Sequence, residues 1–268
     1  LITILLLLFL LGISVGANES IVNNLTTLGG QALLIASAGT LGSVLAAWGV
    51  YHSFLRKGAG DEREFDRRGL LCLGCLLGWS GYLPGVIIEN DITVYVLYLL
   101  MFQVGISIGS DKKLKDILSS IRPKLLLVPL ATIIGTLSFS ALISLALTKW
   151  SVFDCLAVGS GFAYYSLSSI LITELKEPTL GAQLAAELGT IALIANIIRE
   201  IFALLGAPLF VRYFGRLSPI CAGGATTMDT TLPIITRYCG KDLVFVSIFH
   251  GILVDFTVPF FVSFFCSM

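Results

Sequence analysis

Charged residues are scarce in this chain. Asp, Glu, Lys and Arg together make up 13% of its 268 residues, whereas about a quarter of a soluble domain is charged. The acidic and basic residues balance to a formal net charge of zero, so the sequence indicates no nucleic acid or other polyanionic partner. Hydrophobic residues account for 56% of the chain. This composition predicts a protein that lies within a lipid bilayer.

Motifs for metal binding and covalent catalysis are also missing. Cys72 and Cys75 have the Cys-x-x-Cys spacing, but no second pair and no nearby histidine accompanies them, so we interpret the cysteines as small apolar residues of helices. A membrane protease that pairs Asp229 with Asp255 is the enzymatic alternative, and no nucleophile motif or second acid motif supports it. We therefore expect no enzymatic activity, no metal site and no organic cofactor.

Long apolar runs dominate the sequence. A spanning helix needs about 20 largely apolar residues, and most of these runs are apolar on every side, as lipid-embedded helices are. We predict an all-α, polytopic membrane protein with about eight or nine spanning or re-entrant helices. The candidate segments are 1–16, 29–55, 69–88, 92–109, 124–148, 152–173, 182–211, 217–236 and 242–267.

Positive charge is concentrated in two loops. Loops 56–68 and 110–124 each contain five Lys or Arg residues, whereas loops 17–28 and 89–91 contain none. The positive-inside rule therefore places both basic loops in the cytoplasm. They are two predicted spans apart, as the alternation of spans requires.

An internal resemblance predicts an inverted repeat. Residues 4–16 and 97–109 are identical at seven of 13 positions, and a Gly-Thr-Leu follows each copy, at Gly39 and Gly135. The copies are three spans apart, and an odd offset reverses the topology of the second copy.

The repeat also predicts how the chain is organised. We expect one transporter domain, residues 1–268, with repeat units of about 1–68 and 69–148. A motif-bearing part, 149–268, follows them. Because segment 69–88 precedes only the second copy, the native protein is expected to begin with one further span.

Ionisable residues inside predicted spans are functional candidates, because each costs at least about 2.5–3.5 kcal/mol at the bilayer centre. Five lie in the later segments: Glu187, Arg199, Glu200, Asp229 and Asp255. Glu200 and Asn196 are four residues apart and form a polar stripe on one helix face. Arg199 is expected to point elsewhere, toward an acid of another helix, and it is also a candidate for the substrate or proton site. The alternative is a pair with Asp or Glu that only holds helices together.

Segment 217–236 contains helix breakers around a carboxylate. Gly223, Gly224 and Pro233 flank Asp229, and irregular backbone is tolerated in a membrane only where it is buried or lines a wet cavity. We predict a discontinuous or re-entrant helix that holds a cation or an ammonium group. The expected ligands are free carbonyl groups, Asp229 and the hydroxyls of Thr226, Thr227 and Thr230. The alternative is a kinked helix whose threonines bond to their own backbone.

Segment 152–173 is rich in hydroxyl groups, and these predict a substrate path. The residues concerned are Tyr164, Tyr165, Ser166 and Ser168, and tyrosine rings suit an ammonium group. Close helix packing or a break at Gly159 and Gly161 is the competing interpretation. His250, in the last segment, has either a proton-carrying role or a packing role.

Several of these strings resemble the LysO-type family of lysine exporters. The specific ones are GSGFAYYSLSSILITE at 159–174 and GGATTMDTTLP at 223–233, with IRE at 198–200 and HG at 250–251 in support. The resemblance implies export of L-lysine and its toxic analogues across a bacterial inner membrane. It also implies two essential intramembrane acids, which match Glu200 and Asp229, and a fold similar to transporters with crossed broken helices. Family members usually have a further N-terminal helix, and Asp255 matches no family motif.

The charge of lysine predicts the transport mechanism. Moving one positive charge out against an inside-negative potential costs about 2.3 kcal/mol per 100 mV, and exchange for an incoming proton cancels that charge. We expect Glu200 and Asp229 to hold a proton and the substrate's ammonium group in turn. A sodium/proton antiporter, or a transporter of another small solute, is the alternative, with Na⁺ as the other candidate coupling ion. The expected partners are L-lysine or a similar basic amino acid and the lipid bilayer, and a homo-oligomer is compatible with the sequence.

Overall fold

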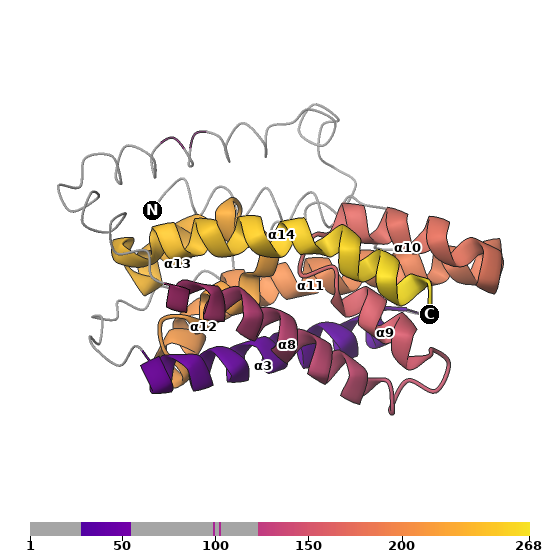
Figure 1. The fold of residues 1–268 in the computed structure, drawn as a ribbon, viewed down its shortest axis with the longest axis horizontal. Helices are drawn as coiled ribbons and strands as arrows, with labels where there is room; N and C mark the ends of the chain where they lie inside the picture. Colours follow the sequence, from indigo (N-terminus) through magenta and orange to yellow (C-terminus); the bar gives the residue numbers. More distant parts are fainter. Residues whose placement is uncertain (1–27, 55–98, 100–101, 103–122) are drawn as a thin grey trace, which may run out of the picture. The chain divides into compact units, whose positions relative to one another are not determined.

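The computed structural model describes residues 28–54, 99, 102 and 123–268. Apart from residues 99 and 102, these belong to one compact unit formed by Thr27–Asp61 and Ile121–Met268. All regular structure in the described residues is helical (Figure 1), which confirms the all-α prediction for this part of the chain.

Two helices from distant parts of the sequence pack closely against each other. They are α3 (Gly29–Phe54) and α8 (Leu127–Ile143), the latter preceded by the short 3₁₀ helix η1 (Pro123–Leu126). At their crossing Gly42 and Gly135 meet, and a Cβ on either would overlap with the carbonyl oxygen of the other. Small residues permit this close backbone approach, as is common between membrane helices.

The predicted segment 152–173 is two helices rather than one. A capping box between Ser151 and Asp154 starts α9 (Val152–Gly159), and α10 (Tyr165–Leu180) follows after a turn. In that turn Phe162 and Ala163 have φ values of 43° and 74°, which residues with a side chain rarely adopt. The interpretation of this glycine-containing region as a break is therefore correct.

A long helix contacts most of the other elements. This helix, α11 (Ala182–Phe214), has 33 residues and packs against α3, α9, α10, α12 and α13. Eleven of its fourteen fully buried residues are apolar or small, and the three polar ones, Asn196, Arg199 and Glu200, lie near its middle. Both interrupted segments, α9–α10 and α12–α13, therefore pack against this helix.

The predicted interruption of segment 217–236 is confirmed. The segment forms α12 (Ser218–Gly223), the 3₁₀ helix η2 (Gly224–Met228) and α13 (Leu232–Cys239). The 3₁₀ turn η3 (Lys241–Leu243) and α14 (Val244–Cys266) complete the chain. Gly224 has a φ of 60°, and a Cβ there would overlap with the carbonyl oxygen of Phe162, so this position requires glycine.

Three helices in the described residues are long and apolar enough to cross a membrane: Gly29–Ser53, Ala182–Phe214 and Lys241–Cys266. They correspond to three predicted segments, whereas segment 124–148 is shorter than predicted because α8 ends at Ile143. Segments 1–16, 69–88 and 92–109 lie outside the described residues. The total number of spans, the repeat units and the inverted repeat therefore stay predictions.

Candidate functional site

Three polar residues occupy adjacent positions on α11. Asn196, Arg199 and Glu200 have exposed fractions of 3%, 3% and 6%. At 3.6 residues per turn, residues three and four positions after Asn196 lie on either side of it. One turn of a buried helix therefore presents an amide, a guanidinium and a carboxylate side by side.

Asn196 holds the break between α9 and α10 in place. Its Oδ1 accepts a hydrogen bond from the backbone N–H of Ala163 at 2.8 Å. Its Nδ2 lies within 3.3 Å of the Val158 carbonyl and the Ser168 hydroxyl, and 2.9 Å from the Ala192 carbonyl. These contacts give Asn196 a positioning role, and its predicted contact with substrate stays a prediction.

The environment of Arg199 differs from the predicted one. Its Nε and Nη2 donate to the carbonyl oxygens of Ala222, at 3.0 Å, and Cys221, at 3.2 Å. These carbonyls belong to the end of α12, where the helix dipole favours a positive charge. Its guanidinium carbon also lies 5.8 Å from the centroid of the Phe162 ring. The expected pair with an acid of another helix does not occur within the described residues.

The ion pairs of the described residues lie elsewhere. They join Lys149 to Glu187, Lys176 to Asp154 and Arg216 to Asp242. Glu187, a candidate from the sequence, is therefore neutralised by Lys149.

Glu200 is a buried acid with spare hydrogen-bonding capacity. Its Oε1 has no hydrogen-bond partner in the part of the chain that the structure describes. The side chain of Thr230 interacts with this carboxyl group, and Asp229 is close enough to act on it electrostatically. An unpartnered carboxylate oxygen in an apolar environment is costly, and a proton or a cationic ligand would relieve that cost.

Asp229 lies where η2 ends and the backbone leaves the helical conformation, with φ and ψ of −134° and −92°. Its half-buried side chain accepts hydrogen bonds from the backbone N–H and the hydroxyl of Thr230. The phenol of Tyr165 is within electrostatic range of both Glu200 and Asp229, and Asp255 is within range of Asp229. The two predicted acids are thus brought together, beside one of the predicted tyrosines.

The predicted threonines divide into two groups. Thr226 and Thr227 donate to the carbonyl oxygens of Gly223, at 2.9 Å, and Gly224, at 2.8 Å, as the alternative interpretation of this segment expected. Thr230 instead interacts with both acids. Thr230 is therefore the threonine best placed to contact a ligand.

His250 is fully buried, and both ring nitrogens have partners. Nδ1 lies 2.9 Å from the Thr227 hydroxyl, and Nε2 lies 2.8 Å from the Thr132 hydroxyl. Thr227 also donates to backbone carbonyls, so it accepts from Nδ1–H. The Thr132 hydroxyl is 3.3 Å from the Val128 carbonyl and 2.8 Å from Nε2, so its proton goes to the nearer acceptor, Nε2. A neutral imidazole satisfies this set, which favours the packing role.

The hydroxyl groups predicted to form a substrate path do not all lie on one surface. Tyr164, Tyr165 and Ser166 are exposed at the start of α10. Ser168 is buried, and its hydroxyl donates to the carbonyl oxygen of Tyr164 at 2.8 Å. Tyr165 is the member of this group whose phenol interacts with both acids.

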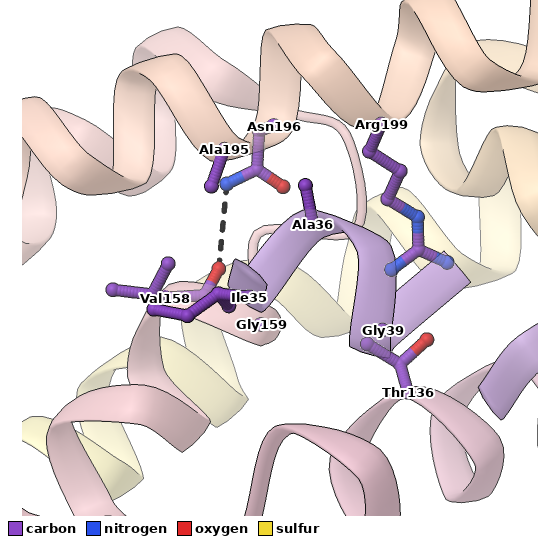
Figure 2. A pocket seen from close by; sticks show the side chains of 9 residues that line it. All are labelled: Ile35, Ala36, Gly39, Thr136, Val158, Gly159, Ala195, Asn196 and Arg199. Carbon is purple, nitrogen blue, oxygen red and sulfur yellow. Dashed lines mark hydrogen bonds between the residues drawn. The ribbon is translucent and has the colours of Figure 1, made fainter. Parts of the chain in front are cut away.

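A small cavity lies beside Asn196 and Arg199 (Figure 2). It is bounded by α3, α8, α9 and α11, and Thr136 of α8 faces the guanidinium. The Thr136 hydroxyl and the nearby Ser140 hydroxyl are buried and have no hydrogen-bond partner among the described residues. Neither hydroxyl was a candidate from the sequence, because only their burial without partners distinguishes them from ordinary helix residues.

A buried acid and a half-buried acid beside two touching helix breaks, in an apolar helical protein, are features of secondary transporters. Similarity to known proteins indicates the same class. The sequence matches the family described as "Lysine exporter LysO" over residues 69–266, and the chain belongs to that family.

Two curated relatives are similar to most of the chain. One is the Escherichia coli (strain K12) protein "Lysine exporter LysO", which is 32% identical over 198 residues. The match covers 74% of this chain and 62% of the relative, so it spans less than two thirds of that protein. A Haemophilus influenzae protein, whose name also refers to lysine export, is 31% identical over 200 residues, 73% of this chain and 94% of the relative. No solved structure matches the chain.

Proposed function

We propose that this protein exports L-lysine, and lysine analogues, across a bacterial inner membrane in exchange for protons. The observation that carries the proposal is the unpartnered Oε1 of buried Glu200 beside Asp229. Membership of the lysine exporter family and the names of the two relatives support the choice of substrate.

The two acids suit a cation that must be bound and released. Two neighbouring carboxylates in an apolar environment are costly when both are charged, so the pair retains a proton or an ammonium group. Binding of lysine from the cytoplasm displaces the proton, and a proton from outside displaces lysine after the site has opened outward. One positive charge leaves for each that enters, so export does no net work against the membrane potential.

The test compares the two acids of the site with Glu187, another acid of the helix that carries Glu200. Glu200→Gln and Asp229→Asn are each expected to lower lysine export from proteoliposomes at least about 100-fold, because a neutral amide binds neither a proton nor an ammonium group. Glu187→Gln is the matched control, since Glu187 already pairs with Lys149. Export that is unchanged in the Glu200→Gln/Asp229→Asn double variant would refute the proposal, as would export driven by a sodium gradient but not by a pH gradient.

A further inference from the structure

The small cavity beside α11 has donors without acceptors. Thr136 and Ser140 are fully buried, and their hydroxyls have no partner in the described residues. A Cβ built on Gly39, which lines the cavity, would lie 3.7 Å from both Ser140 Oγ and Arg199 Nη1. The Ser140 hydroxyl and the guanidinium therefore both lie close to Gly39, and Thr136, which also lines the cavity, lies beside them with its Cγ2 3.2 Å from the same point. Arg199 Nη1 makes no hydrogen bond to the described residues, since its bonds to α12 use Nε and Nη2.

The chemistry of these groups specifies an acceptor. A guanidinium can only donate hydrogen bonds, and hydroxyls can add two more donors. A carboxylate or another small anion is the ligand that such a set binds best.

The buried positive charge of Arg199 also indicates an anionic ligand. The side chain is 3% exposed, and its partners in the described residues are carbonyl dipoles rather than carboxylates. A buried charge without a counter-charge is expensive. A bound anion would supply that counter-charge.

The cavity and the acids lie next to each other along α11. Arg199 and Glu200 are neighbours in sequence, on either side of Asn196 on the helix surface. The carboxylate and ammonium groups of an α-amino acid are attached to the same carbon atom. A guanidinium and a carboxylate from one helical turn match that arrangement. Lysine carries two ammonium groups and one carboxylate, and the buried site offers two acids and one guanidinium.

We propose that this cavity binds one oxygen of the α-carboxylate of the exported amino acid, with Arg199, Thr136 and Ser140 as donors. The inference rests on the proposed function and adds the part of the site that distinguishes an amino acid from a simple amine. About 10 Å³ of the cavity is open to a water-sized sphere, which is at the lower limit for one oxygen-sized group. The rest of the substrate would lie on the side of Asn196 that faces the acids.

The experiment compares lysine with 1,5-diaminopentane, which is lysine without its carboxylate. Affinities of the full chain in nanodiscs are measured for both ligands. The wild type is expected to bind lysine at least about tenfold more tightly, and Thr136→Val/Ser140→Ala is expected to remove most of that preference by weakening lysine alone. Thr190→Val is the control, since the exposed Thr190 hydroxyl bonds only to its own helix at Ala186.

A second variant tests the same cavity without removing a hydroxyl. Gly39→Ala adds a methyl group 3.2 Å from Thr136 Cγ2, so a small adjustment accommodates it, and the variant is expected to show the same selective loss of lysine affinity. Equal losses for both ligands, or an unchanged preference, would overturn the inference while leaving lysine export intact. If both ligands bind in chloride buffer but not in sulfate buffer, the cavity belongs to a free anion, and the inference is also overturned. A wild type that binds no lysine would instead refute the proposed function, and the inference with it.

Discussion

The backbone N–H of Ala225 donates a hydrogen bond to the carbonyl oxygen of Phe162 at 2.8 Å. Phe162 lies in the break between α9 and α10, and Ala225 lies just after the break between α12 and η2. Each break therefore satisfies a backbone group that the other leaves without a helical partner. Because unsatisfied backbone groups are costly in an apolar environment, the two interruptions stabilise each other.

Replacement of Gly224 tests this junction. Gly224→Ala would place a methyl group against the Phe162 carbonyl at a φ of 60°, so we expect strong destabilisation, about 3 kcal/mol or more, and loss of export. Gly30→Ala is the control, because no atom lies within 4 Å of a Cβ at Gly30. Thermal unfolding of the purified protein in detergent measures both, and equal stability of the two variants would contradict the role given to the junction.

The two interpretations of His250 make different predictions for its replacement. His250→Leu removes the side-chain hydrogen bonds to the hydroxyls of Thr132 and Thr227, so we expect a loss of about 2–3 kcal/mol in the free energy of unfolding. Because the imidazole is already fully bonded as a neutral group, the dependence of residual export on pH should keep its shape. A pH profile that changes shape in His250→Leu, but not in a variant of exposed His52, would show that the histidine carries a proton.

Much of the local structure could be predicted from residue types alone. Glycine and proline in segment 217–236 predicted the discontinuous helix. The cost of buried charge selected five candidate residues, and the family resemblance selected Glu200 and Asp229 among them. Both signals are local, because breakers and charges act on the segment that contains them. For the same reason, the apolar length of segment 182–211 was enough to predict a long helix.

Interactions across the fold could not be predicted in the same way. The sequence does not show that Arg199 binds the carbonyls at the end of α12, because any helix end offers the same groups. Nor does it show that Thr136 faces Arg199 while Thr132, one turn earlier, faces His250. Such partners depend on the rotation of packed helices about their axes, and a helix that is apolar all round carries no pattern that fixes this rotation.

Asn196 is predicted to be essential for the shape of the first break. Asn196→Ala removes the acceptor of the Ala163 N–H and the donor to the Val158 carbonyl, so the positive-φ turn loses its support. We expect a loss of about 2–3 kcal/mol in stability and a large drop in lysine export. Asn196→Gln, which keeps both functional groups on a longer side chain, should fail equally, because the Asn196 amide packs directly against Gly161, where even an added Cβ would overlap with Nδ2. Full export by Asn196→Gln would contradict this prediction and show that the break also accepts an amide on a longer side chain.

The buried ion pair between Lys176 and Asp154 gives a test of how α9 is anchored to α10. Its Nζ–Oδ1 distance is 2.9 Å, and both side chains are less than a tenth exposed. Lys176→Met is expected to cost about 3–5 kcal/mol, because it leaves a buried carboxylate without a counter-charge, whereas Lys176→Met/Asp154→Asn should recover a large part of that loss. Thermal unfolding of the two variants and of Asp154→Asn completes a double-mutant cycle. Additive losses around the cycle would mean that the pair contributes nothing beyond the two separate side chains, and the Ser151 capping box would then be the main anchor of α9.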